Sequence, residues 1–317
     1  MKWTQAPIAL RARKKQKWAP LHLKPTDLQN RQSPRERLHI QIQVYLQWRQ
    51  SVLIKSPRWS EEPQFWRRTF ANKSSVFNLS PPPPHLSLSL QWRQLLEQFG
   101  FIVHDDKTLK VVAERSGFRE ALLKAIENIQ TPILITQAER WPLTMLTDIQ
   151  YAWNNSSQSE RPALFLGGAI RGGEVDHQFW LPDLSISESL DRLGVEHLKS
   201  ADSDRLMVFI RRSGGIPAFV RALQTLVEQD TLSKSSVEQA WKPLLDEAQQ
   251  IVDHLSTDMK PYMRLCSIVQ SGARPFVYGV DQPLIETGLI RKIRRGVKAF
   301  VVLRAPIFAR CIHSSAN

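Results

Sequence analysis

The stretch that decides the fold reads Ser51-Val52-Leu53-Ile54-Lys55-Ser56-Pro57-Arg58-Trp59-Ser60-Glu61-Glu62-Pro63, followed by Gln64-Phe65-Trp66-Arg67-Arg68-Thr69-Phe70. The apolar run at 51–54 predicts a buried strand. The segment at 64–70 predicts a helix. Pro63 suits the first turn of that helix, because proline has no N–H to pair and its φ is already close to the helical value. The sequence therefore predicts a strand, a loop and a helix in direct succession.

The loop keeps the spacing of a phosphate-binding P-loop but none of its working residues. A P-loop reads glycine, four residues, glycine, lysine, then serine or threonine, between a strand and a helix. At that spacing the four working positions hold Ser56, Glu61, Glu62 and Pro63. The glutamates would repel a polyphosphate, although they favour a helix start because they face the positive end of its dipole. We expect a degenerate P-loop; the alternative is an ordinary strand, loop and helix without P-loop ancestry.

A second apolar run, Ile133-Leu134-Ile135, ends in two uncharged polar residues, Thr136 and Gln137. In P-loop ATPases the corresponding strand ends in aspartate and glutamate, which assist Mg²⁺ and orient the attacking water. Neither Thr136 nor Gln137 can hold a metal well or act as a base. Because both halves of the catalytic machinery are replaced, we expect no ATP hydrolysis, no cofactor and no metal site.

The ordered series of segments resembles the AAA+ ATPases, in particular the archaeal- and STAND-type branch that carries a C-terminal winged helix. Further members of the series are strands at 75–79 and 163–169, the passage Leu181-Pro182-Asp183 into a helical lid, and Gly214-Gly215-Ile216-Pro217 with Arg221 after it. In the family, an arginine at the position of Arg221 can reach a nucleotide. The resemblance covers roughly residues 35–317, and the departures fall on nucleotide-handling positions.

The resemblance implies an α/β fold: an AAA+-like P-loop NTPase core with a parallel sheet, a helical lid and a C-terminal winged-helix domain. The expected organisation is a basic extended N-terminal arm at 1–34, a degenerate AAA+-like core at 35–180, a helical lid at 181–245 and a winged-helix domain at 246–317. Helices are expected within the core at 92–100 and 118–129, where apolar residues recur at helical spacing.

Positive charge is concentrated at the two ends of the chain. The 317 residues carry a net charge of +13, of which 1–72 contribute +11 and 287–317 contribute +7, so the middle is mildly acidic. The arm lacks helical or strand periodicity and is expected to contact phosphate backbones. Its candidate nucleic-acid-binding cations are Arg11, Arg13, Lys14, Lys15 and Lys17. A solvated tail and a transit peptide are the alternatives.

The C-terminal segment has the pattern of a winged helix. Helices are expected at 258–271 and at 283–290, the second stopped by Gly288, followed by a hairpin at 290–302 that turns at Arg295-Gly296. The cations expected to line the wing and contact DNA phosphates are Arg291, Lys292, Arg294, Arg295 and Lys298. Winged helices of the family also serve in protein docking, which is the alternative. No base preference can be read, because the second helix offers no clear set of arginine, asparagine or glutamine.

These features favour a non-catalytic AAA+-like subunit. It would bind DNA, mainly through the phosphate backbone, and recruit other protein subunits, an active AAA+ ATPase among them, in a DNA-targeting complex of a mobile element or of phage defence. The alternatives are a STAND-like switch that senses a ligand through lid and winged helix, and a working ATPase with a rebuilt site, which Glu62 and Thr136 disfavour. Two widely spaced cysteines, no hydrophobic signal core and no long apolar run predict a cytoplasmic protein without a membrane segment.

Overall fold

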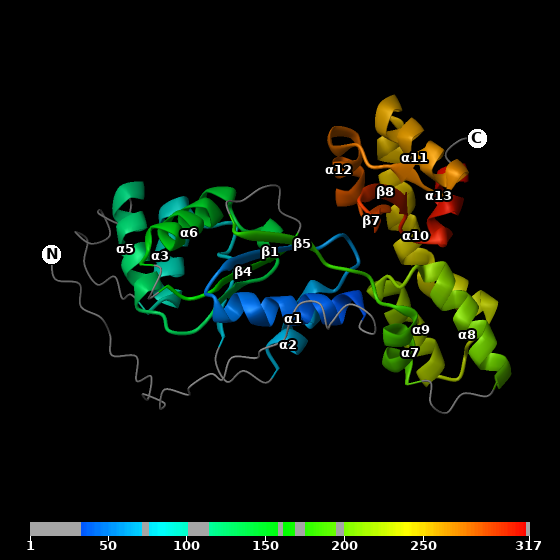
Figure 1. Cartoon of the computed structure of the whole chain (residues 1–317), viewed down its shortest axis with the longest axis horizontal. Helices are drawn as coiled ribbons and strands as arrows, with labels where there is room; N and C mark the ends of the chain where they lie inside the picture. Colours follow the sequence, from blue (N-terminus) through cyan, green and yellow to red (C-terminus); the bar gives the residue numbers. More distant parts are fainter. Residues whose placement is uncertain are drawn as a thin grey trace. The chain divides into compact units, whose positions relative to one another are not determined.

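The computed structural model describes residues 33–71, 76–100, 114–157, 161–168, 175–194 and 200–314 (Figure 1). The predicted basic arm therefore lies outside the described residues, apart from its last two positions. The described chain forms two compact units. The first contains 36–55 and 62–180, and the second contains 33–35, 56–61 and 181–314. No helix in the described part is both long enough and apolar enough to cross a membrane.

A five-stranded parallel sheet forms the centre of the first unit. Its strands are β1 (Ser51–Lys55), β2 (Phe77–Leu79), β3 (Ile133–Ile135), β4 (Leu164–Gly168) and β5 (His177–Trp180). They lie in the order β2-β3-β4-β1-β5, so that β1 has β4 on one side and β5 on the other. The sequence predicted four of these strands. It did not predict β5, whose His-Gln-Phe-Trp sequence has neither an apolar run nor clean alternation.

Helices cover both faces of the sheet. They are α1 (Pro34–Gln47), α2 (Glu62–Thr69), α3 (Leu88–Gln98), α5 (Arg115–Glu127) and α6 (Leu143–Asn155). Helices α3, α5 and α6 lie together on one side, where they enclose a core with Leu53, Leu164 and Leu166 (Figure 1). On the opposite side, the ring of Trp66 in α2 and the ring of Phe70, which directly follows α2, pack on Phe165. Successive strand residues thus alternate between two cores, as parallel strands buried on both faces require.

Element ends differ from the prediction by a few residues. Helices α3 and α5 begin earlier than predicted, because the polar residues of their first turns interrupt the apolar spacing. Strand β3 stops at Ile135, and Gln137 has a left-handed backbone (φ 51°) that turns the chain into a 3₁₀ turn at Ala138–Arg140. Ser75 and Ala169, at the outer ends of two predicted strands, lie outside the described residues.

The second unit combines a group of helices with a small antiparallel sheet. Its helices are α7 (Ile186–Leu193), α8 (Ser200–Ser213), α9 (Pro217–Glu228), α10 (Lys234–Ser256), α11 (Met259–Ser271), α12 (Tyr278–Glu286) and α13 (Ala309–Ser314). Its strands are β6 (Arg274–Pro275), β7 (Ile290–Arg295) and β8 (Lys298–Leu303), in the order β6-β8-β7. The predicted hairpin is present, and its turn places Arg295 opposite Lys298.

The prediction of a helix at 283–290, stopped by Gly288, was wrong at its start, whereas Gly288 (φ 82°) does directly follow its C-cap residue, Thr287. Helix α12 begins at Tyr278 and ends at Glu286, with Pro283 inside it. The start is fixed by Asp281, whose carboxylate accepts the N–H of Val277 at 2.7 Å. Pro283 suggested a helix start because proline is favoured there, but here it occupies the second turn.

Candidate functional site

The loop at 56–61, which follows β1, is held by other groups of the second unit through its backbone carbonyls. Those of residues 58, 59 and 60 each accept a hydrogen bond from a distant part of the sequence. The pairs are Arg304 Nη1 to Arg58 O (2.6 Å), Ala218 N to Trp59 O (3.2 Å) and Arg35 Nη2 to Ser60 O (3.1 Å). A P-loop turns N–H groups towards a phosphate. This loop instead turns three C=O groups towards donors of its own protein.

Side chains of the loop are anchored as well. The Trp59 indole donates to Glu247 Oε2 at 2.7 Å, and Arg58 pairs with the other oxygen of Glu247 at 2.5 Å. The Trp59 ring also packs on Phe308, with 5.3 Å between ring centroids. Trp59 and Glu61 both have left-handed backbones (φ 64° and 54°), which costs a non-glycine residue about 1 kcal/mol. The anchoring contacts offset that cost and fix the conformation of the loop.

Glu61 lies between two arginines. Its carboxylate, 10 % exposed, is 2.6 Å from Arg192 Nη2 at the end of α7 and 2.7 Å from Arg221 Nε in α9. By resemblance, Arg221 is the arginine expected to reach a nucleotide. In this structure its Nε contacts the carboxylate of the protein's own loop. The second glycine position of the P-loop pattern thus carries an anion that pairs with the cations of α7 and α9.

Glu62, in the first unit, is buried at the start of α2. Desolvation raises the pKa of its carboxyl group to about 7, and the nearby Glu139 carboxylate adds to the rise. The backbone N–H of Gln137, 3.5 Å from Glu62 Oε2, and the Trp66 indole act in the opposite direction. Glu62 therefore changes charge near neutral pH, where a P-loop lysine would carry a fixed positive charge.

The two glycines that end β4 make room for these groups. A Cβ at Gly167 would lie 1.9 Å from Glu62 Oε1 and 2.3 Å from the Trp66 indole nitrogen. A Cβ at Gly168 would lie 2.3 Å from Glu139 Oε2 and 2.6 Å from the backbone nitrogen of Ala138. Adjacent glycines at a strand end signal such a close approach, but the sequence alone does not say which side chains fill the space.

The other residues at the P-loop spacing and after β3 are uncharged. Ser56 and Pro63 are half-buried at either end of the loop, with Ser56 in the second unit and Pro63 in the first. Thr136 and Gln137 follow β3, and the Gln137 side-chain oxygen accepts a hydrogen bond from Arg140 at 2.8 Å. The four P-loop positions are thus divided between the two units.

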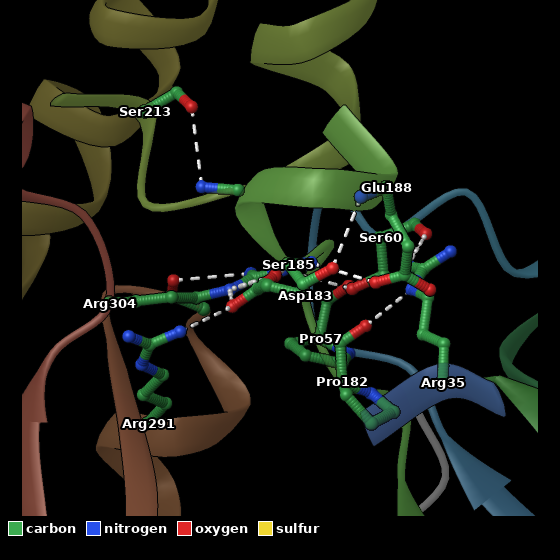
Figure 2. A network of polar contacts seen from close by, with 12 residues as sticks. Arg35, Pro57, Ser60, Pro182, Asp183, Ser185, Glu188, Ser213, Arg291 and Arg304 are labelled. Carbon is green, nitrogen blue, oxygen red and sulfur yellow. Dashed lines mark hydrogen bonds and ion pairs between the residues drawn. The ribbon is translucent and has the colours of Figure 1, made fainter. Parts of the chain in front are cut away.

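A buried arginine connects the loop, the segment before α7 and the C-terminal residues of the second unit (Figure 2). Arg304 is 1 % exposed and binds both oxygens of Asp183, at 2.6–3.0 Å. It also donates to the carbonyl of Gly288 (3.3 Å) and to Ser60 Oγ (3.0 Å). Asp183 was part of a predicted passage into a lid, but nothing in the sequence pointed to Arg304 as its partner.

Arg35 closes the other side of this network (Figure 2). Its Nε donates to the carbonyl of Pro182 at 2.7 Å. Burial lowers the pKa of Arg35 to about 10, although the carboxylates of Asp183 and Glu188 act to raise it. Ser33 donates to Glu188 at 2.8 Å, so the first described residues of the chain are fixed at the start of α7.

The cations predicted for the hairpin are all exposed, but they differ in their partners. Arg291 lies 3.6 Å from Asp183. Lys292 Nζ is 3.9 Å from the ring centroid of Phe276, and Arg295 lies over Phe300 at 5.9 Å. The side chains of Arg294 and Lys298 form no ion pair with a group of the described chain. The predicted cations of the arm, Arg11, Arg13, Lys14, Lys15 and Lys17, lie outside the described residues.

Similarity to solved structures agrees with the arrangement of the sheet. A Walker-type ATPase of Pyrococcus abyssi aligns with a TM-score of 0.53 and 13% identity, over 88% of this chain and 95% of that one. The fold is that of an AAA+-like P-loop ATPase. At this identity the likeness shows the fold alone and leaves the activity open.

Two other structures align less well. The Cdc6 protein of Pyrobaculum aerophilum has a TM-score of 0.46 at 11% identity, over 91% of this chain and 96% of that one. A STAND protein with a tetratricopeptide repeat sensor, from Pyrococcus horikoshii, has 0.41 at 16%, over 88% of this chain and 42% of that one. Both TM-scores are below 0.5, so the fold assignment rests on the P. abyssi ATPase. No protein-family model and no curated protein matches the sequence.

Proposed function

We propose that the chain is a non-catalytic AAA+-like subunit that binds nucleic acid and recruits partner proteins within a multi-subunit DNA-targeting complex. The position of the Glu61 carboxylate between Arg192 and Arg221 carries the non-catalytic part of this proposal. A phosphate group would have to displace a tethered carboxylate to reach either arginine. The internal pair thus satisfies the cations that would otherwise attract a nucleotide.

Two further features support the loss of nucleotide chemistry. Glu62 replaces the P-loop lysine with a buried acid, which cannot neutralise a polyphosphate at any pH. After β3, Thr136 and Gln137 provide no carboxylate to assist a metal ion or to act as a base. We therefore assign the internal ion pair the role that a bound nucleotide has in an active ATPase, which is to hold α7 and α9 against the loop.

Nucleic-acid binding is proposed for the basic arm and the basic hairpin. Residues 258–314 contain ten Lys/Arg and three Asp/Glu, and one of the acids, Asp281, is fully buried against Arg264. Within this segment helix α11, strand β6, helix α12 and the β7–β8 hairpin follow in the order of a winged helix, and we propose that assignment. Exposed cations on a hairpin suit the phosphate backbone of DNA.

Partner recruitment follows from the proposed fold relationship. AAA+ proteins assemble side by side, and a silent copy can cap such an assembly or bring it to a nucleic acid. We propose that the partners include other protein subunits and an active AAA+ ATPase, in a complex of a mobile element or of phage defence in the cytoplasm.

The deciding experiment titrates the purified chain with a fluorescent ATP analogue and Mg²⁺, and in parallel with labelled duplex DNA at several salt concentrations. The proposal predicts no nucleotide binding and salt-sensitive DNA binding. Micromolar binding of the nucleotide would overturn the non-catalytic assignment and favour a STAND-like switch. DNA affinity that is absent at low salt would remove nucleic acid from the proposal.

A further inference from the structure

An exposed apolar patch lies at the start of α12. Tyr278 is 75 % exposed, and Val277 and Val280 beside it are also exposed. Single exposed hydrophobic residues are ordinary on protein surfaces, whereas three within four positions form a contiguous patch of the kind found at binding sites. The exposed positions of α12 carry no charged side chain that could read base edges. The patch is instead apolar and includes an aromatic ring, which suits it to contact with flat apolar surfaces.

The backbone that presents Tyr278 is rigid. Buried Asp281 accepts the N–H of Val277 at 2.7 Å and pairs with Arg264 Nε at 2.8 Å. Arg264 also donates to the carbonyl of Pro275 at 2.6 Å. The chain on either side of Tyr278 is therefore held by the ion pair between Arg264 of α11 and the buried Asp281 of α12. A ring fixed in this way loses little conformational entropy when it binds a ligand.

The ring of Phe276 lies between Tyr278 and a cation of the hairpin, Lys292. The rings of Phe276 and Tyr278 meet edge to face at 6.4 Å, and Lys292 Nζ lies 3.9 Å from the centroid of Phe276. The N–H of Phe276 donates to the carbonyl of Ala299 at 2.9 Å, which fixes this segment to β8. Arg294 and Lys298, on the same hairpin, have no ion-pair partner within the described chain, and the sequence from 287 to 317 contains no acidic residue.

We propose that Tyr278 stacks on an unpaired base of single-stranded DNA, whose phosphates contact Lys292 and Arg294, which share one face of the hairpin. The inference rests on the proposed nucleic-acid function and names its ligand class. Proteins that hold single strands combine a cationic groove with aromatic rings on which bases stack, and each such ring contributes roughly 1–3 kcal/mol. Base pairs in an intact duplex already stack on their neighbours, so the exposed ring favours the single strand.

The test is fluorescence anisotropy of the full chain with a labelled oligothymidylate and with a duplex of the same length. Tyr278→Ala is expected to weaken oligothymidylate binding by roughly 5- to 150-fold, which is the stacking contribution expressed as a ratio of affinities. Tyr278→Phe retains the ring and is expected to bind the oligothymidylate like the wild type. Neither substitution changes charge, so the salt dependence of binding stays the same in both.

Arg294→Ala is the matched control, because it removes a phosphate contact and leaves the ring in place. It is expected to weaken single-strand and duplex binding alike and to reduce the dependence on salt. An oligothymidylate affinity that is unchanged in Tyr278→Ala, or reduced equally in Tyr278→Phe, would overturn stacking while the nucleic-acid function stands. A wild-type chain that binds neither DNA would overturn both.

Discussion

At the scale of single residues, Glu61 joins two helices through one carboxylate. Arg192 belongs to α7 and Arg221 to α9, and both contact it within 2.7 Å. Arg192 and Glu61 are largely shielded from water, whereas the Arg221 side chain is 53 % exposed. The pair with Arg192 is therefore expected to contribute most of the stabilisation, because solvent screens the pair with Arg221.

Glu61→Gln keeps the shape of the side chain and removes its charge. We expect the free energy of unfolding to fall by about 1–3 kcal/mol, since Arg192, which is largely shielded from water, loses the opposite charge of Glu61. Inorganic phosphate should then stabilise Glu61→Gln more than the wild type, because an anion can bind the arginines that Glu61 vacates. Urea denaturation with and without phosphate measures both effects.

Glu247→Gln is the control for this experiment, because it removes a carboxylate that also contacts the loop but is 41 % exposed. Its loss of stability should be smaller, and phosphate should not affect it differently from the wild type. An equal response of both variants to phosphate would contradict the assignment of an anion site to Arg192 and Arg221.

The raised pKa of Glu62 makes stability depend on pH in a predictable direction. The folded chain binds a proton at Glu62 up to about pH 7, whereas the unfolded chain releases it near pH 4.5. The free energy of unfolding contributed by this group therefore falls as pH rises from 4.5 to 7 and is constant above that interval. The full effect of such a shift is about 3 kcal/mol.

Glu62→Gln removes this titration. We expect the variant to be more stable than the wild type at pH 8, by up to about 3 kcal/mol, and similar to it at pH 5. Urea denaturation at the two pH values measures the difference, with Glu97→Gln, a partly exposed acid of the same unit, as the control. A stability difference that is the same at both pH values would show that Glu62 is charged throughout.

The loop illustrates which part of a site can be predicted from sequence. The P-loop spacing singled out Ser56, Glu61, Glu62 and Pro63, because a P-loop is a local pattern along the chain. That these positions derive from a working P-loop is part of the proposal. The partners of Glu61 and of the loop carbonyls could not be predicted. Most of them lie more than a hundred residues away, in α7, α9 and the segment after β8, and Arg35 precedes Ser60 by 25 residues. No local pattern connects any of them to the loop.

At the scale of elements, the β7–β8 hairpin was predicted because a glycine between two short strands is a local signal, although the turn is Gly296-Val297, one residue later than predicted. Strand β5 and the start of α12 depend on contacts made after folding. Strand β5 pairs with β1 although its own sequence is only weakly strand-like, and α12 starts where the buried Asp281 carboxylate accepts a backbone N–H.

The charge of the hairpin can be tested as a unit. Arg294→Glu combined with Arg295→Glu is expected to weaken duplex binding and to lower the salt-dependence slope by about 2, since each lost phosphate contact accounts for about 0.9. Anisotropy titrations across a series of salt concentrations provide the slope. Deleting residues 1–20 tests the arm separately, and the slope should fall again.

Lys234→Glu with Lys242→Glu is the matched control, because both lysines are exposed on α10 and the change in net charge is identical. This variant should keep most of the DNA affinity of the wild type. If both charge-reversed variants lose affinity equally, net charge rather than the hairpin would account for binding.

At the scale of the whole molecule, Arg304 is the residue whose loss should affect the most distant parts of the sequence. It connects Arg58, Ser60, Asp183 and Gly288 from a buried position. Arg304→Met is expected to cost about 3–5 kcal/mol of stability, because it leaves a buried carboxylate without its main partner. Thermal or urea denaturation measures the loss.

Arg310→Met serves as the comparison, since Arg310 is 58 % exposed and lies 3.5 Å from Glu238. Its cost should stay below about 1 kcal/mol. Replacing Asp183 by Leu in the Arg304→Met background should restore part of the lost stability, because it removes the orphaned charge. No recovery in the double variant would show that the hydrogen bonds to the loop, and not the ion pair, carry the effect.

The chain enters its second unit three times, at 33–35, at 56–61 and from 181 onward. A gene truncated to start at codon 181 would encode Arg304 and Asp183, but not Arg58, Ser60 or Glu61. Arg192 and Arg221 would then have no carboxylate from the loop, and Arg304 would lose two of its acceptors. We therefore expect a fragment that starts at residue 181 to be less stable than the second unit of the whole chain, because it lacks the loop that contacts these arginines.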